Sequence, residues 1–206
     1  MALHVLDHPL SQHLVASLRD KSTQPQRFRQ LTKNLTTLLV LEATKGLRLV
    51  DSSVETPLEY AQAKRLGQSV AAVPVLRAGL GMLEPVTELF PEVAVGYIGL
   101  ERSEDTAIAH SYYSKLPQLE ATFTLCLDPM LATGGSASQA LSFIKAKGAD
   151  RVVMVCIVAA PEGVSRIQQD HPDVDIFTSA LDRELDHRKY ILPGLGDFGD
   201  RLYGTQ

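Results

Sequence analysis

Apolar side chains recur every three or four residues near the N-terminus, as they do along one face of a helix. Two segments share this spacing, residues 11–19 and residues 26–43, and Lys45-Gly46 follows the second one. A glycine just past a periodic segment is a common helix stop. The pattern predicts two amphipathic helices with the apolar positions Leu14, Val15, Leu18, Phe28, Leu31, Leu35, Leu38 and Leu39.

The middle of the chain changes to short apolar runs. Residues 70–76 are apolar throughout, which predicts a central strand buried on both faces. Residues 79–89 favour a helix that Pro85 could interrupt. Residues 93–100 predict the next strand, and Arg102 stands just past its end.

A long polar segment, residues 103–110, follows that strand. Beyond it, Tyr112, Tyr113 and Leu116 favour the return strand of a hairpin. The stretch therefore predicts a β-hairpin arm with a polar tip, and such an arm could close over a substrate and exclude water.

The C-terminal half alternates between strands and helices. Gly148 is a helix stop inside this region, and the tail from Pro193, rich in glycine, is interpreted as an ordered loop. Alternating elements predict an α/β fold with a twisted, mainly parallel sheet and helices on both faces. The expected elements are a strand at 122–127, a helix at 137–147, a strand at 152–158, a helix at 163–169 and a strand at 175–181.

Composition narrows the class of protein. The 206 residues fit a single domain, residues 1–206, and 45% of them are hydrophobic. The net charge of −4 disfavours a dedicated nucleic-acid binder. The longest apolar run, residues 152–161, is too short to span a bilayer, and the N-terminus lacks the pattern of a signal peptide. We expect a cytoplasmic protein with neither nucleic acid nor membrane as a partner.

The cysteines and histidines do not suggest a metal centre. Cys126 and Cys156 lie in apolar, strand-like runs, which predicts buried free thiols. The six histidines show no ligand spacing, so we expect no metal that is bound by protein ligands alone.

The most informative stretch is residues 125–140, LCLDPMLATGGSASQA. It combines a strand, a loop of small residues and an amphipathic helix, and a helix N-terminus offers free N–H groups to an anion. Gly134 and Gly135 would let the backbone approach a phosphate, and Thr133 and Ser136 add hydroxyl donors. Asp128, at the end of the strand, could reach the diol of a sugar.

This loop resembles the phosphoribosyl pyrophosphate (PRPP) loop of type I phosphoribosyltransferases. Most members carry two adjacent acids at the strand end, whereas here Pro129 follows Asp128. That form is similar to the uracil phosphoribosyltransferase branch. Three further segments resemble the same branch in the same order, namely VPVLRAGLGM at 73–82, VAAPEG at 158–163 and YILPGLGDFGD at 190–200.

The resemblance implies the type I fold, with a β-hairpin arm and a small hood, and the reaction of uracil with PRPP to give UMP and pyrophosphate. It implies catalytic roles for Arg102, Asp128 and Asp197, and Mg²⁺ bound mainly through PRPP. It also implies a homodimer or higher homo-oligomer, and GTP as an effector of some relatives. The implied uracil contacts are Ile191, Gly196, Asp197 and Phe198. The implied PRPP contacts are Arg77, Arg102, Asp128, Pro129, Met130, Leu131, Ala132, Thr133, Gly134, Gly135, Ser136 and Asp197.

Several residues keep alternative interpretations. Arg77 could cap a carboxylate, Arg102 could be a solvated surface residue, and Asp128 could cap a helix. Asp197 is a candidate, and no more, for the base that removes the uracil N1 proton. The GxGxxG spacing at 194–199 is not interpreted as a dinucleotide site, because only seven residues follow it. At the level of function, the alternatives are a nucleotide-sensing RNA-binding regulator and an enzyme for a purine base.

Overall fold

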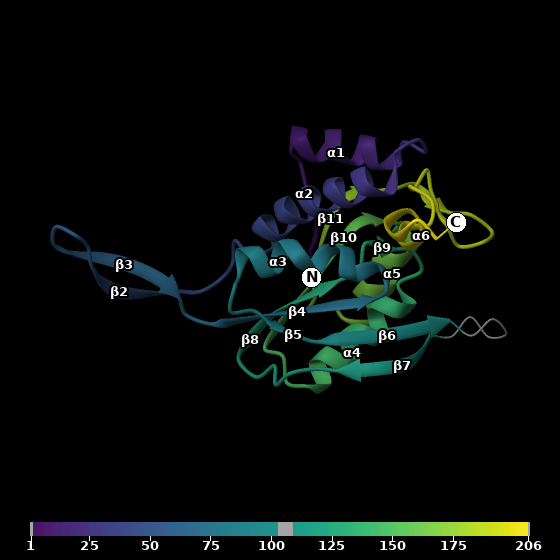
Figure 1. Ribbon diagram of the computed structural model, residues 1–206. Helices are drawn as coiled ribbons and strands as arrows, with labels where there is room; N and C mark the ends of the chain where they lie inside the picture. Colours follow the sequence, from purple (N-terminus) through teal and green to yellow (C-terminus); the bar gives the residue numbers. More distant parts are fainter. Residues whose placement is uncertain (1, 103–108, 206) are drawn as a thin grey trace.

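The computed structural model describes residues 2–102 and 109–205. A single large sheet forms its centre (Figure 1). All neighbouring strands of the sheet are parallel except β6 and β7, which form an antiparallel hairpin. The strands lie in the order β1 (Leu3–Val5), β11 (Asp175–Leu181), β10 (Arg151–Ala159), β8 (Thr122–Leu127), β4 (Ser69–Leu76), β6 (Tyr97–Arg102) and β7 (Ala109–Lys115), with β5 (Ala94–Val95) beside β4 and β9 (Met130–Leu131) beside β10.

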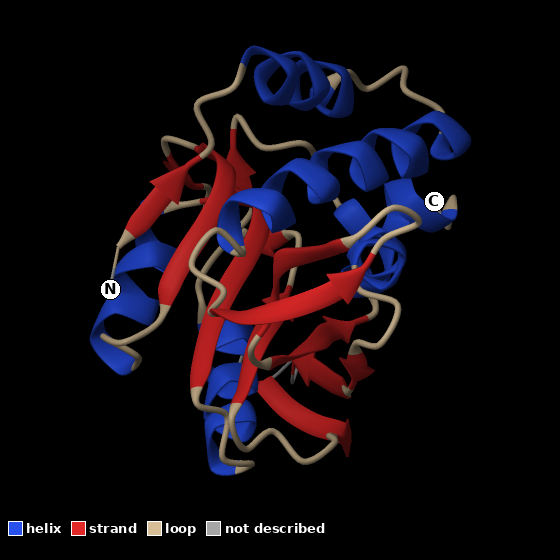
Figure 2. Cartoon of the chain, turned by 90° about the vertical axis from the view of Figure 1, so that its left-hand side faces the viewer, coloured by secondary structure: helices blue, strands red, loops and turns tan. Residues whose placement is uncertain are grey.

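Helices cover both faces of the sheet, as Figure 2 shows. The reason is visible in β4, where Val70 and Ala72 join one hydrophobic core while Ala71 and Val73 join the other. A strand buried on both faces therefore needs helices on both sides. One core holds α1 (Pro9–Arg19), α2 (Pro25–Ala43), α3 (Leu83–Leu89) and α6 (Phe198–Tyr203), and the other holds α4 (Gly135–Ala146) and α5 (Pro161–Asp170).

The expected α/β architecture is confirmed, and so is the hairpin arm of β6 and β7. Its polar tip, residues 103–108, lies outside the described residues. The hood forms where the N-terminal α1 meets the C-terminal segments, which include the small hairpin of β12 (Glu184–Leu185) and β13 (Ile191–Leu192).

Two expected elements are subdivided. The strand expected at 93–100 is split into β5 and β6 on either side of Gly96, although the N–H of Gly96 still donates to the carbonyl of Ala72 in β4 at 3.0 Å. The helix expected at 79–89 starts as a 3₁₀-helix, η1 (Ala78–Met82), and continues as α3. Pro85 does not interrupt α3, because it lies in the first turn, where no helical hydrogen bond is lost.

Two elements differ from the sequence-based expectation altogether. The tail was expected to be a loop, but residues Phe198–Tyr203 form α6, so the expectation that no helix fits after the glycines was wrong. A second hairpin, β2 (Leu49–Glu55) with β3 (Tyr60–Leu66), was not expected. We call this hairpin the β2–β3 arm, and it projects from the left of the body in Figure 1.

Candidate active site

Most of the PRPP contacts expected from the sequence lie together at the carboxyl ends of the parallel strands. Arg77 follows β4, Asp128 follows β8, and Asp197 comes from the C-terminal tail. They surround a pocket of about 330 Å³, at the edge where open parallel sheets bind ligands. The pocket is lined by Val75, Leu76, Arg77, Ala78, Leu100, Asp128, Met130, Leu131, Ala132, Thr133, Gly134, Gly135, Ser136, Ala137 and Asp197.

The start of α4 forms one wall of this pocket. Gly134 is the N-cap residue with φ +77°, a left-handed conformation that favours glycine. A β-carbon at Gly134 would lie 2.9 Å from the carbonyl oxygen of Gly163, whereas at Gly135 its nearest neighbour would be the Thr133 hydroxyl at 3.7 Å. Gly135 therefore faces open space, and the first N–H groups of α4 can reach an anion there.

Asp128 comes directly after the last residue of β8. Its backbone N–H donates to Val155 O at 3.2 Å, which ties it to β10, and its Oδ1 accepts a long hydrogen bond of 3.4 Å from the N–H of Met130. The N-cap of α4 is Gly134, so the interpretation of Asp128 as a helix cap is wrong. The side chain is half-buried and lines the pocket.

Arg77 begins the turn after β4 and is exposed. Its carbonyl accepts hydrogen bonds from the N–H of Leu80 at 3.1 Å and from the hydroxyl of Tyr203 at 3.0 Å. Burial raises the pKa of the Tyr203 phenol above its ordinary range. Within the described part of the chain Arg77 forms no salt bridge with a carboxylate, so its guanidinium is available to a ligand in the pocket.

Asp197 lies at the start of α6. Its Oδ1 caps the helix by accepting the N–H of Asp200 at 2.9 Å, and its side chain is exposed at the pocket. The preceding segment is rich in left-handed backbone, with φ +58° at Gly194 and φ +81° at Gly196. At its two glycines this segment has no side chain to cover the backbone, so N–H and C=O groups can face a ligand there.

The other expected contacts do not line the pocket. Ile191 and Phe198 are buried in the core, where Phe198 packs edge-on against Phe28 with ring centroids 5.0 Å apart. Only their backbone groups could face a ligand. Pro129 is buried and its carbonyl accepts from β10. Gly196 lines a neighbouring pocket of about 490 Å³ instead.

Arg102 is the last residue of β6, and its side chain lies outside the described residues. Sequence reasoning also missed contributors to the pocket. Val75, Leu76, Ala78 and Leu100 line it as ends of strands or starts of turns. These apolar side chains carry no reactive group that would mark them in the sequence. Their positions near the ends of β4 and β6 could have indicated that they lie at the site.

A larger cavity of about 590 Å³ lies elsewhere, between residues 66–70 and residues 89–93. It is at the amino end of β4 and contains none of the expected functional residues. We assign the site to the smaller pocket because the candidate chemistry and the carboxyl-end rule for parallel sheets agree there.

The carboxylates that line the pocket are those of Asp128 and Asp197. Within residues 2–102 and 109–205, no three His, Cys, Asp or Glu side chains gather closely enough to hold a metal ion. Two carboxylates beside a phosphate cup suit a hard cation that takes most of its ligands from water and substrate oxygens. In the same described ranges no helix has the length and apolar character needed to cross a membrane.

Comparison with known proteins agrees with this geometry. The structure superposes on hypoxanthine phosphoribosyltransferase from Staphylococcus aureus with a TM-score of 0.51 and 12% identity, over 81% of this chain and 84% of that one. The AQ2163 protein of Aquifex aeolicus matches with a TM-score of 0.95 and 40% identity over 99% of both chains. The fold is that of the type I phosphoribosyltransferases.

Sequence comparison narrows that class. The family model for uracil phosphoribosyltransferase matches residues 5–205. The uracil phosphoribosyltransferases of Shouchella clausii and Natranaerobius thermophilus are 47% and 48% identical to the chain, each over 99% of both sequences. The chain belongs to the uracil phosphoribosyltransferase family.

Proposed function

We propose that the protein transfers the phosphoribosyl group of PRPP to N1 of uracil and releases pyrophosphate, which makes it a pentosyltransferase of pyrimidine salvage. The observation that carries this proposal is the pocket itself. It joins the start of α4, the Asp128 carboxylate at the end of β8, the exposed Arg77, and Asp197 at the end of the glycine-rich tail segment.

Each residue then has a task in the reaction. The backbone from Thr133 to Ser136 holds the 5′-phosphate, and Asp128 accepts hydrogen bonds from the ribose hydroxyls. Arg77 holds the pyrophosphate, since its planar fork suits two phosphate oxygens. Arg102 joins it there when the β6–β7 hairpin covers the substrate.

In the chemical step, the bond from C1′ to pyrophosphate breaks, the bond from C1′ to N1 forms, and N1 loses its proton. Positive charge develops on the ribose, as in glycoside cleavage. The leaving pyrophosphate is already stable as an anion, so the chain needs no acid to protonate it. Mg²⁺ carried by PRPP would further stabilise the charge on the leaving group. The protein positions the reactants and stabilises charge.

Uracil lies against the 193–198 segment in this proposal. Gly196 and the backbone of Ile191 and Phe198 read its carbonyls and N3–H, and Asp197 stands between base and PRPP. Asp197 is the candidate base for the N1 proton.

The test is direct. The protein is incubated with PRPP, Mg²⁺ and labelled uracil, and UMP is followed by chromatography. We expect UMP with uracil and no nucleotide with hypoxanthine or cytosine. A preference for a purine would contradict the assignment, and tight RNA binding in a filter assay without any transfer would favour the regulatory alternative.

Three finer properties are proposals that rest on family membership. The protein forms at least a homodimer, GTP acts as an effector, and the enzyme works in the cytoplasm. Sedimentation of the purified chain tests the first, UMP formation with and without GTP tests the second, and cell fractionation tests the third.

A further inference from the structure

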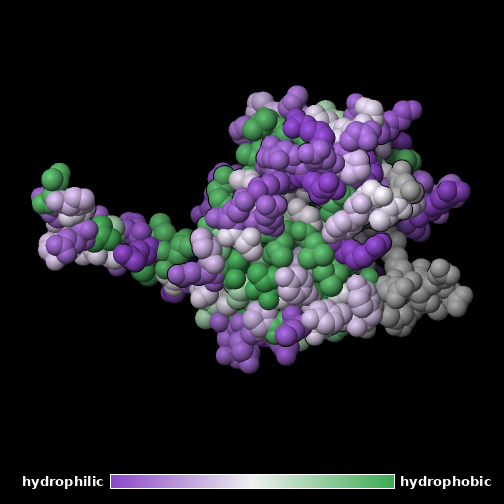
Figure 3. Space-filling model, viewed as in Figure 1, coloured by the Kyte–Doolittle hydropathy of each residue, from purple (hydrophilic) through white to green (hydrophobic). Residues whose placement is uncertain are grey.

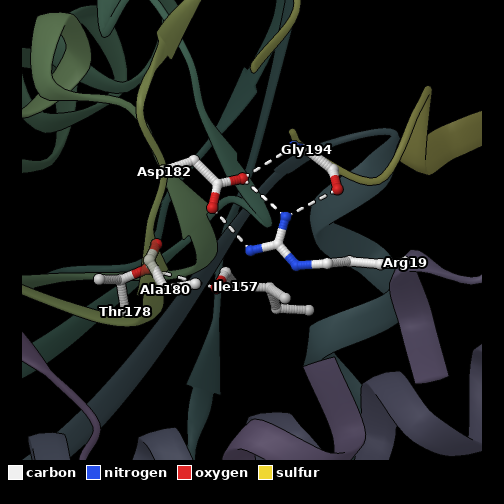
Figure 4. Close-up of polar contacts among 6 residues, drawn as sticks. All are labelled: Arg19, Ile157, Thr178, Ala180, Asp182 and Gly194. Carbon is white, nitrogen blue, oxygen red and sulfur yellow. Dashed lines mark hydrogen bonds and ion pairs between the residues drawn. The ribbon is translucent and has the colours of Figure 1, made fainter. Parts of the chain in front are cut away.

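The backbone of Gly194 forms hydrogen bonds to both members of an ion pair, through its N–H and through its carbonyl group. Its N–H donates to Asp182 Oδ2 at 2.8 Å, and its carbonyl accepts from Arg19 Nη1 at 2.8 Å. Arg19 also binds Asp182 through both guanidinium nitrogens, at 2.8 and 2.6 Å (Figure 4). The three residues therefore form a closed ring of hydrogen bonds, which we call the Gly194 clamp.

The clamp joins three distant parts of the sequence. Arg19 is the last residue of α1, Asp182 follows β11, and Gly194 lies in the glycine-rich tail. Asp182 is fixed to the sheet, because its N–H donates to the carbonyl of Ala159 in β10 at 2.8 Å. The tail is thereby attached to the central sheet.

The burial of the pair shows what it can and cannot do. The side chain of Asp182 is 5% exposed and that of Arg19 is 25% exposed. Removing two charges from water is costly, so a buried ion pair adds little net stability. A bidentate arginine–carboxylate pair does fix geometry, because two parallel hydrogen bonds define a direction as well as a distance.

The position of Gly194 makes that geometry relevant to the base. Gly194 starts the segment that ends at Asp197 in the pocket. The far end is fixed separately, where Asp197 caps α6 and Arg201 Nη1 donates to the carbonyl of Leu195 at 2.7 Å. Neither Arg19 nor Asp182 lines the 330 Å³ pocket, whereas Arg19 lines the neighbouring 490 Å³ pocket together with Gly194 and Gly196.

We propose that the Arg19–Asp182 pair is a positioning device that sets the backbone of residues 194–197 in the register needed to bind uracil. The inference rests on the proposed function, in which this segment reads the base through its own N–H and C=O groups. Backbone groups that recognise a base cannot adjust by changing a side-chain rotamer. The precision of recognition therefore depends on the contacts that fix the position of the backbone.

The experiment compares Asp182→Asn and Arg19→Lys with the wild-type protein. Asp182→Asn keeps the shape but replaces one acceptor by a donor, and Arg19→Lys keeps the charge but loses the fork. We expect KM for uracil to rise roughly 10- to 100-fold, the equivalent of one lost hydrogen bond to a charged group. KM for PRPP should stay at its wild-type value.

Asp173→Asn is the matched control. It breaks the Lys145–Asp173 salt bridge on α4, far along the chain from the base segment, and should leave both KM values unchanged. A second control uses Arg19→Ala with added guanidinium ion. The free ion should lower KM for uracil again if the missing fork is the cause.

Failure of the proposed function and failure of the clamp proposal give different results. A wild-type protein that makes no UMP would refute the proposed function, whatever the variants do. With an active wild type, an unchanged KM for uracil would overturn the clamp proposal, and so would equal changes in both KM values. Failure of both variants to fold would also overturn it, since the pair would then support the fold rather than the reading of the base.

Discussion

At the scale of single residues, Gly134 and Gly135 are neighbours with different requirements. Gly134 needs its left-handed backbone and has the carbonyl of Gly163 close by. Gly135 has neither constraint, and only the space of the pocket faces it. Substitutions at the two positions should therefore separate folding from phosphate binding.

We expect Gly135→Val to weaken PRPP binding by about tenfold or more, since the added methyl groups keep phosphate from the N–H groups of α4. The midpoint of urea unfolding should change little. Gly134→Ala is the contrasting variant and should lower the free energy of unfolding by about 1–3 kcal/mol through backbone strain. Calorimetric titration with PRPP and urea denaturation measure both. Normal PRPP affinity in Gly135→Val would show that α4 does not bind the phosphate.

The two thiols give a prediction for alkaline pH. Burial raises the pKa of the Cys156 thiol to about 12, and burial likewise raises the pKa of the Cys126 thiol well above its ordinary value. The folded protein thus keeps both protons while the unfolded chain loses them above pH 9. The contribution of the two thiols to the free energy of unfolding is fully present below that pH. It decreases as the pH rises, by roughly 1.4 kcal/mol per pH unit for each thiol.

Urea denaturation between pH 8 and pH 10.5 would measure the slope. The double variant Cys126→Ala/Cys156→Ala serves as the reference, since it keeps every other titrating group. Its stability at pH 8 will be lower because of the cavities, but its decline with pH should be shallower. Equal slopes would mean that the thiols already ionise in the folded state.

At the scale of elements, α6 links the two ends of the pocket. Its N-cap is Asp197, and its last residue, Tyr203, donates to the carbonyl of Arg77 at 3.0 Å. Arg29 of α2 holds the same helix by donating to the carbonyl of Leu202 at 2.8 Å. A six-residue helix therefore couples the segment assigned to uracil with the turn assigned to pyrophosphate.

Tyr203→Phe should loosen that turn and little else. We expect KM for PRPP to rise about 2- to 10-fold, the range for one neutral hydrogen bond, with KM for uracil nearly unchanged. Steady-state kinetics with each substrate varied in turn would check this. Tyr60→Phe, on the β2–β3 arm, removes an exposed phenol and should change neither value. A selective effect on uracil would contradict the assignment of the Arg77 turn to pyrophosphate.

The elements that could be predicted from the sequence are those whose buried positions appear as apolar runs or as apolar periodicity. The β8–α4–β10 unit was predictable because its strands are buried over almost their whole length and hold mostly β-favouring, apolar residues, and because Gly148 follows the helix. The β2–β3 arm was missed because both its faces are largely exposed, so no apolar periodicity marks it. The helix α6 was missed because glycines dominate the tail, although Asp197 followed by Asp200 is a capping signal.

Some parts of the candidate site could likewise be predicted from the sequence, and others could not. Arg77, Asp128 and the Thr133–Ser136 backbone were predictable because their residue types carry chemistry next to strand ends, and Asp197 was predicted through the family resemblance of residues 190–200. The Gly194 clamp could not be predicted, since Arg19 and Asp182 are 163 positions apart and each resembles an ordinary charged residue in sequence. Only the packing of α1 against the end of β11 brings them together.

At the scale of the whole molecule, the β2–β3 arm is the feature that the monomer does not explain. It extends away from the body and carries hydrophobic side chains near its end (Figure 3). Leu58 at its turn is 95% exposed and Tyr60 is 72% exposed. An isolated two-stranded hairpin is marginally stable in water, so an arm of this length needs a surface to pack on.

A second copy of the chain is the partner that we expect. In a two-fold dimer the β2–β3 arm of each subunit would pack on the other subunit, so the same contact would form twice and both arms would be buried. The double variant Leu58→Asp/Tyr60→Asp should then shift the protein from dimer to monomer, measured by light scattering after size-exclusion chromatography across a dilution series. Lys64→Ala removes a charged pair with Asp51 on the same arm and is the matched control, expected to remain dimeric. A wild-type protein that stays monomeric at every concentration would refute the assignment. A double variant that dimerises as strongly as the wild type would show that the arm is not part of the interface.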